Sequence, residues 1–353
     1  MILFVCESLF QLFNAINLRT TLFKDESVDI CVCEKTGLFQ NVIGFLKKSK
    51  VFDQVYYYGA PMNAKQDLLN KVKKIIYAHK ILSHITESLP DIKYDYNKVF
   101  VSGAGLSSAS IYYFIHRHNK NTKCCLYEDG MFEYVVYTNK ELWSRRLISK
   151  LLFGEYYLDT AVELYVYEPN LTINIPTHIR KIAIPKIENY QNRQLYNMIY
   201  NFDDKGLDVI DRCSYIYVDT CFFDESSSVI QYDIVERLYK KVGDKLLVKL
   251  HPRSDIHKYD KIGVTCLKSS QIMELIVMNK KLTHCTFLSS ISTAIFNMKS
   301  VFNQTPKLII LNNIFNICGF NQGIAKYIHN FIFSYPKDKI FQPQNSDELF
   351  NLI

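Results

Sequence analysis

The chain has 353 residues, of which 48% are hydrophobic, and this is enough to form the cores of two domains. The formal net charge of +7 is mildly basic, which argues against a nucleic-acid-binding protein and suits an anionic substrate or an anionic membrane surface. The ten cysteines lie mostly in apolar, strand-like runs without a CxxC pair, which indicates buried, reduced thiols in a cytoplasmic protein. The first residues lack the basic start of a signal peptide, and no apolar run approaches the length of a membrane span.

The first half of the chain alternates short apolar strands with amphipathic helices, which is typical of an α/β domain with a mainly parallel sheet. A basic amphipathic segment at 141–158 is expected either to lie at a membrane interface or to pack as an ordinary helix. Hydrophobic periodicity predicts strands, some ending in turns, at 1–6, 28–33, 54–59, 98–105 and 123–130, and helices between them at 8–23, 38–48, 64–90 and 106–118.

The second half repeats this pattern. We place the domain boundary at 190/191, so that an N-terminal domain covers 1–190 and a C-terminal domain covers 191–353. The expected fold class is α/β, with two doubly wound, Rossmann-like domains facing a central cleft, and such sheets bind ligands outside the carboxyl ends of their strands. In the second half, the pattern predicts strands at 213–222, 245–252, 262–267, 281–288 and 307–312, and helices at 229–243, 270–280 and from 289.

The first polar cluster at a predicted strand end consists of Glu128, Asp129 and Gly130. Two adjacent carboxylates disfavour each other's charge, which raises the pKa and suits a general base that deprotonates a sugar hydroxyl. The alternative is a turn whose acids cap the next helix or are solvated.

A second cluster ends the predicted strand at 245–252, where His251 is followed by Pro252. An imidazole there can donate a proton or a hydrogen bond to the phosphate of a leaving group, or it can be a structural histidine. Glu274, on the predicted helix at 270–280, can accept hydrogen bonds from ribose hydroxyls or be solvated on a surface helix.

A third polar cluster in the chain opens the last predicted helix with hydroxyl side chains. Free N–H groups and the dipole at a helix start attract an anion, and hydroxyls add donors for a phosphate. Simple N-capping is the alternative. The hydroxyl residues are Ser289, Ser290, Ser292 and Thr293.

Some sequence signals of nucleotide sites are absent from the chain. It contains no Asp-x-Asp, no GxxxxGK[ST] phosphate loop and no GxGxxG fingerprint. The chain therefore lacks the pair of carboxylates that usually binds a metal-bound nucleoside diphosphate. A leaving group with one phosphate needs less charge neutralisation, so we expect neither a metal nor another cofactor.

Taken together and in this order, the motifs resemble those of the bacterial sialyltransferases of GT-B fold that make sialylated lipooligosaccharide and capsular polysaccharide. The segment LYEDGMFEYV looks like their LYDDG-type segment, KLHP like their HP motif and SSISTA like their serine motif. The start SLFQLFNAI is similar to their SPLQxxNA start, although Leu9 and Phe10 stand where the family often has a proline before the glutamine. These motifs span residues 8 to 293.

The resemblance implies roles for individual residues. The catalytic base falls on Asp129, with Glu128 as the alternative, and His251 becomes the general acid that contacts the phosphate. The resemblance places donor-binding roles on Lys249, Leu250, Pro252, Glu274, Ser289, Ser290 and Thr220, and acceptor-side roles on Ser8, Gln11, Asn14, Gly103 and Gly130.

The implied reaction is the inverting, metal-independent transfer of sialic acid from CMP-sialic acid to a sugar hydroxyl of a surface glycan, through an oxocarbenium-like transition state. The expected partners are CMP-sialic acid and an oligosaccharide or lipid-linked glycan acceptor, with peripheral contact to the cytoplasmic face of the inner membrane and none to nucleic acid. Two alternatives stay open: a GT-B hexosyltransferase that uses a nucleotide-diphosphate sugar, and a non-catalytic peripheral binding protein.

Overall fold

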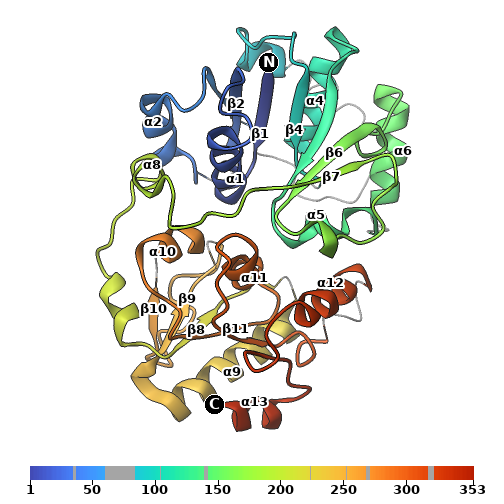
Figure 1. The fold of residues 1–353 in the computed structure, drawn as a ribbon. Coiled ribbons are helices and arrows are strands. Elements are labelled where there is room, and N and C mark those ends of the chain that lie inside the picture. The colour runs from blue at the N-terminus through green and yellow to red at the C-terminus, as the bar shows by residue number, and fades with distance from the viewer. Residues whose placement is uncertain are drawn as a thin grey trace. The chain divides into compact units, whose positions relative to one another are not determined.

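The computed structural model describes residues 1–34, 37–59, 84–103, 105–138, 142–222, 224–251, 253–267, 271–316 and 322–353. These residues divide into two compact units (Figure 1). Unit 1 comprises Met1–Pro185 and Gln194–Asn201, and unit 2 comprises Lys186–Arg193 and Phe202–Ile353. The expected boundary at 190/191 falls inside the short segment Lys186–Arg193. Most of the helix predicted at 64–90 lies outside the described residues.

Unit 1 contains a seven-stranded sheet of order β3-β2-β1-β4-β5-β6-β7, in which neighbouring strands run parallel. The order reverses between β1 and β4, which is the kind of switch point where open α/β sheets bind ligands. The strands are β1 (Ile2–Cys6), β2 (Val28–Glu34), β3 (Val55–Gly59), β4 (Lys98–Val101), β5 (Lys123–Tyr127), β6 (Ala161–Val166) and β7 (Arg180–Ala183).

Helices accompany these strands as the periodicity predicted. The first helix has a polar cap, because the Ser8 side chain accepts a hydrogen bond from the amide of Gln11. The described helices are α1 (Leu9–Thr20), α2 (Gln40–Ser49), α4 (Leu106–His118), α5 (Met131–Val135), α6 (Leu142–Phe153), α7 (Tyr157–Thr160) and α8 (Arg193–Ile199).

Unit 2 contains a six-stranded parallel sheet of order β10-β9-β8-β11-β12-β13, and its order reverses between β8 and β11. The strands are β8 (Tyr215–Val218), β9 (Leu246–Lys249), β10 (Thr265–Leu267), β11 (Thr286–Ser289), β12 (Lys307–Ile310) and β13 (Ile340–Phe341). The helices are α9 (Glu225–Val242), α10 (Met273–Asn279), α11 (Thr293–Ser300), α12 (Gln322–Phe333) and α13 (Ser346–Leu352).

The clearest departure from the predicted elements concerns the serine segment. The predicted helix start at residue 289 is wrong, because Ser289 is the last residue of β11 and α11 begins at Thr293. The side chain of Ser289 donates to the carbonyl oxygen of Val218 at 2.8 Å, which ties it to the neighbouring strand β8. The pair Ser289 and Ser290 suggested a helix cap, but Ser289 ends a buried strand and Ser290 follows it.

Aromatic residues form much of the core of unit 1. Phe4 stacks on Phe100 with ring centroids 4.4 Å apart, and Tyr127 meets Phe4 edge-on at 5.5 Å. Such pairs add to the free energy gained by burying their apolar area. The core of unit 2 is mainly aliphatic, and one buried cluster contains Ile234 of α9, Val248 of β9 and Leu288 of β11.

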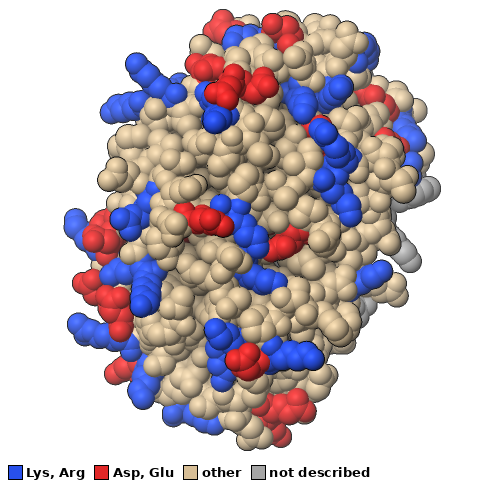
Figure 2. Space-filling model, in the orientation of Figure 1, with Lys and Arg blue, Asp and Glu red and all other residues tan. Residues whose placement is uncertain are grey.

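The described cysteines are free, and most of them are buried. Burial raises the pKa of the Cys6 thiol, which keeps it protonated. No helix in the described part of the chain combines the length and the apolar character needed to cross a bilayer. On the face drawn in Figure 2, basic and acidic side chains are interspersed rather than gathered into one broad patch.

Candidate functional site

The N-cap of helix α1, Ser8, and two polar residues of the helix bind the acidic turn that follows β5. Ser8 donates to Oδ1 of Asp129 at 2.7 Å, and the Gln11 side-chain amide donates to Oδ2 at 2.7 Å. The side-chain amide of Asn14 donates to the carbonyl oxygen of Glu128 at 2.9 Å. Residues three apart share a helix face, so one face of α1 contacts the turn at successive points. Two motifs that are far apart in the sequence thus form one site in unit 1.

The two acids of this turn have different environments. Glu128 is buried, and its carboxylate accepts hydrogen bonds from the Tyr134 hydroxyl at 2.7 Å and the Tyr167 amide at 2.8 Å. Burial raises its pKa to about 8, although both hydrogen bonds oppose the shift. From the sequence, we expected the neighbouring acid to be the main cause of a raised pKa. In the structure, the charge of Asp129 raises the pKa of Glu128 only slightly. Asp129 is only half-buried, which favours it over Glu128 as the group that could contact a ligand.

A third carboxylate, Glu133 of α5, was not anticipated from the sequence. Its side chain is fully buried, with one oxygen 3.0 Å from the Gly103 amide and the other 2.9 Å from the Asp129 amide. Burial raises its pKa well above the ordinary value, and the charge of Asp129 adds to the shift. The available signal was the spacing, since an acid four residues after Asp129 can fold back onto the turn.

The two glycines of the expected acceptor side have backbone roles. A Cβ on Gly103 would lie 2.5 Å from Cγ2 of Val136, so only glycine fits there without movement. Gly130 has φ of +89°, a conformation that side chains disfavour, and it immediately precedes α5. Gly103 therefore allows a close approach to Val136, and Gly130 allows the chain to turn directly after Asp129.

In unit 2, a buried carboxylate at the end of β8 organises the loop after β9. Asp219 accepts hydrogen bonds from Lys258 and from the Tyr259 hydroxyl, each at 2.9 Å, and from the His251 amide at 3.3 Å. Gln231 and Ser254 also donate to it. Burial alone would raise the pKa of Asp219, but these hydrogen bonds and the charge of Lys258 outweigh burial and lower it. Sequence reasoning missed Asp219, although it directly precedes the predicted Thr220.

His251 is half-buried and lies at the start of the loop after β9, where its amide donates to Asp219. Its Nδ1 accepts a hydrogen bond from the Arg253 amide at 3.1 Å, so the neutral ring carries its proton on Nε2. Burial and the charge of Arg253 lower its pKa. The free protein therefore presents a neutral imidazole whose Nε2–H can donate to an anion. Pro252 lies outside the described residues.

The ends of β8 and β11 are joined by hydroxyl groups at the switch point of the second sheet. Ser290 is fully buried and donates to Oγ1 of Thr220 at 2.8 Å, which leaves the hydroxyl hydrogen of the half-buried Thr220 for another acceptor. The half-buried hydroxyls at the start of α11 are those of Ser292, its N-cap, and Thr293. The predicted phosphate-binding serines thus support this edge of the sheet, while Thr220 and Ser292 are the more accessible.

The remaining predicted donor residues are buried beside this edge. Lys249 ends β9, its Nζ donates to the carbonyl oxygen of Leu250 at 3.2 Å, and burial lowers its pKa to about 8 against the opposing charge of Glu274. Glu274 is buried in α10 rather than solvated, and it accepts a hydrogen bond from Asn297 at 2.6 Å. Burial raises the pKa of Glu274.

The basic segment predicted at 141–158 includes α6. On this helix Leu147 and Leu151 are 56% and 73% exposed and one turn apart. Arg146 and Lys150 form ion pairs with Asp159 at 2.9 and 3.1 Å. The expected membrane contact of this segment stays a prediction.

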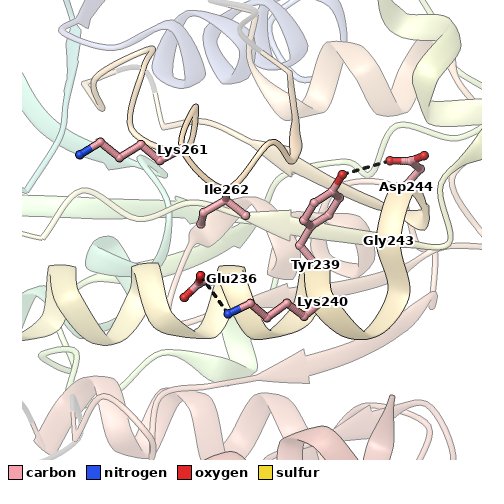
Figure 3. Close-up of a pocket in the computed structure, with 7 residues that line it drawn as sticks. All are labelled: Glu236, Tyr239, Lys240, Gly243, Asp244, Lys261 and Ile262. Carbon is pink, nitrogen blue, oxygen red and sulfur yellow. Dashed lines mark hydrogen bonds and ion pairs between the residues drawn. The ribbon is translucent and has the colours of Figure 1, made fainter.

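A surface cavity of about 430 Å³ lies elsewhere in unit 2 (Figure 3). It is bordered by the end of α9 and by residues that precede β9 and β10, and is therefore at the amino ends of these strands. An ion pair between Glu236 and Lys240 at 3.0 Å lies at its rim. Because nucleotides bind at carboxyl ends, we assign it no part in the site. The described residues contain no cluster of three metal-ligating side chains, and this leaves the expected metal independence untested.

Comparisons with known proteins find matches among solved structures. No family model and no curated protein matches the chain. A UDP-GlcNAc 2-epimerase from Neisseria meningitidis, bound to UDP-GlcNAc, is 12% identical with a TM-score of 0.54, over 99% of this chain and 98% of that one. The GT-B domain of a Photobacterium damselae sialyltransferase is 13% identical with a TM-score of 0.51, over 97% and 100%. Phytolacca americana UGT2, complexed with UDP-2-fluoro-glucose and pterostilbene, is 12% identical with a TM-score of 0.55, over 97% and 85%.

Identities this low show the fold alone. The two parallel-sheet α/β units and these neighbours define the class of protein as GT-B, which confirms the predicted fold class. The narrower resemblance to sialyltransferases, and the expectation that the polar groups of both units face one cleft, stay predictions.

Proposed function

We propose that the chain is an inverting glycosyltransferase that moves sialic acid from CMP-sialic acid to a hydroxyl of a terminal sugar on a surface glycan. The observation that carries the proposal is the position of the motifs. In each unit they gather at the carboxyl ends of the strands beside the point where the strand order reverses, where open α/β sheets bind ligands. Six residues lie there: Ser8, Gln11 and Asp129 in unit 1, and Thr220, His251 and Ser290 in unit 2.

In the proposed reaction, Asp129 accepts the proton of the acceptor hydroxyl as its oxygen attacks the anomeric carbon of the donor. Ser8 and Gln11 each donate to one oxygen of this carboxylate, which fixes its orientation. Removing the proton as the new bond forms is general base catalysis, which typically contributes 10²–10⁴-fold. The bond between the anomeric carbon and the phosphate oxygen breaks, and its electron pair leaves with CMP.

The leaving phosphate gains negative charge, and unit 2 supplies neutral donors to receive it. The Nε2–H of His251 is one, because Nδ1 is already an acceptor for the Arg253 amide. The Thr220 hydroxyl is another, because its oxygen accepts from Ser290. Buried Lys249 contributes positive charge nearby, and the start of α11 adds the favourable end of a helix dipole.

The second candidate is a GT-B enzyme that uses a uridine-diphosphate sugar. The structural neighbours bound to UDP or UDP-sugars favour it. A donor with one phosphate suits unit 2 better, since the described residues around the start of α11 offer hydroxyls and one imidazole rather than several cationic groups.

Two measurements test the proposal. CMP release from CMP-sialic acid is followed with a panel of galactosides, with and without EDTA, and we expect release that depends on the galactoside and survives EDTA. A thermal-shift titration compares CMP with UDP, and we expect stabilisation by CMP. Stabilisation by UDP alone, with no transfer from CMP-sialic acid, would support the second candidate. A protein that neither binds nor turns over a nucleotide sugar would be a binding protein instead.

A further inference from the structure

The carboxylate of Glu133 is buried and forms no ion pair with a cation in the described part of the chain, and each of its oxygens accepts a backbone amide. One accepts the amide of Gly103, at the end of β4, and the other accepts the amide of Asp129, at the end of β5. Burying a carboxylate is costly unless hydrogen bonds compensate for the lost water. The unfavourable free energy of burying a carboxylate at this turn indicates that the backbone geometry of the turn is important.

The backbone on either side is shaped to bring these two amides to Glu133. Gly103 approaches Val136 so closely that a Cβ would not fit, and the Tyr157 hydroxyl donates to its carbonyl oxygen at 2.7 Å. Gly130 takes a positive φ directly after Asp129, which turns the chain into α5 and returns Glu133 toward the strand ends. The turn is therefore held from both strands.

We propose that Glu133 is a positioning residue for Asp129: by accepting the two amides it fixes the turn so that the Asp129 carboxylate stays between Ser8 and Gln11. This inference rests on the proposed function, in which Asp129 is the base. A glutamine of the same shape cannot replace Glu133, because its NH₂ group would face one of the two N–H donors.

The test compares Glu133→Gln with Glu163→Gln in the full-length protein. Glu163 is a matched control, because it is another buried carboxylate of unit 1 that accepts from Lys98 at 2.7 Å and Tyr165 at 2.8 Å, away from the turn. We expect Glu133→Gln to lower kcat about 100-fold, the typical effect of misplacing a catalytic group by 1 Å, with an unchanged KM for the donor. Glu163→Gln lowers the melting temperature and leaves kcat near wild type.

A second readout does not depend on activity. Hydrogen–deuterium exchange is followed in peptides that contain Asp129 and Gly103, and both lose protection in Glu133→Gln but not in Glu163→Gln. If Glu133→Gln keeps both kcat and protection, or loses no more kcat than Glu163→Gln, the inference is wrong. If wild-type protein transfers no sialic acid, the proposed function fails, whereas the exchange data still decide whether Glu133 holds the turn.

Discussion

The side-chain amide of Gln11 donates a 2.7 Å hydrogen bond to Asp129, a residue 118 positions later in the chain. Gln11 is buried and Asp129 is half-buried, so the bond is partly shielded from water. A hydrogen bond to a charged group contributes about 1.5–3 kcal/mol, and a buried donor or acceptor that loses its partner costs about as much.

The first prediction concerns this bond. Gln11→Met keeps the length of the side chain but removes both the donor to Asp129 and the oxygen that accepts the Glu7 amide, and we expect a loss of at least about 1.5–3 kcal/mol of stability together with reduced transfer. Thermal melting and the CMP-release assay measure the two effects. Gln40→Met is the control, since Gln40 is exposed on α2 and should tolerate the change. Equal melting temperatures for the two variants would show that the bond contributes nothing.

The second prediction separates the two acids of the turn. Asp129→Asn should lower kcat by about 10²–10⁴-fold because the base is lost, and should lower the melting temperature only slightly if its NH₂ group faces the Ser8 hydroxyl, whose oxygen can accept, while its amide oxygen still accepts from Gln11. Glu128→Leu should lower the melting temperature, because it leaves the Tyr134 hydroxyl and the Tyr167 amide without the buried oxygen that accepts both of their hydrogen bonds. The reverse pattern would assign the base to Glu128.

The third prediction concerns the phosphate end of the donor. Thr220→Val removes the hydroxyl but keeps the shape, and we expect KM for CMP-sialic acid to rise about tenfold, which corresponds to about 1.4 kcal/mol. Thr265→Val, an exposed position on β10 of the same sheet, serves as the control. An unchanged KM for Thr220→Val would remove Thr220 from the donor site.

The fourth prediction concerns the loop that carries His251. Asp219→Asn leaves an NH₂ group facing donors and leaves Lys258 without its buried anion, so we expect about 3–5 kcal/mol of destabilisation and weaker CMP binding. Asp233→Asn removes only an exposed ion pair with Arg237 on α9 and should melt like wild type. Thermal melting with and without CMP measures both effects. A variant that melts and binds CMP normally would contradict the role of Asp219.

The fifth prediction concerns pH. Burial would raise the pKa of Glu163, but hydrogen bonds from Lys98, Arg180 and Tyr165 lower it to about 2, below its ordinary value of 4.5. A depressed folded-state pKa stabilises the protein above the unfolded-state value, and that stability is lost as pH falls from about 4.5 toward about 2. The melting-temperature difference between wild type and Glu163→Gln should therefore be full at pH 7 and shrink toward pH 3. A difference that does not change with pH would contradict this.

The sequence predicted the alternation of strands and helices well, because fully buried parallel strands read as continuous apolar runs. It also placed Asp129 and His251 at strand ends. The sequence did not predict that Ser8, Gln11 and Asn14 bind the acidic turn. Residue patterns describe local structure, and they do not show which distant segments come into contact.

The missed residues share a physical cause. Asp219 and Glu133 are buried carboxylates, and in a sequence such acids look like solvated ones until the donors around them are known. The serine segment misled in the opposite direction, because the hydroxyls of Ser289 and Ser290 donate to Val218, the last residue of β8, and to Thr220 just after it. Local propensity assigned both serines to a helix, but in the structure Ser289 is the last residue of β11 and Ser290 directly follows it.

The polar face of α1 also has a consequence for synthesis of the chain. Gln11 and Asn14 leave the ribosome more than a hundred residues ahead of the turn that satisfies them. Until β5 and α5 have emerged, those amides can pair only with water, so only the apolar face of α1 holds it against the nascent sheet. The polar contacts of α1 therefore form only after the acidic turn has been synthesised, and a chain that ends before this turn lacks them.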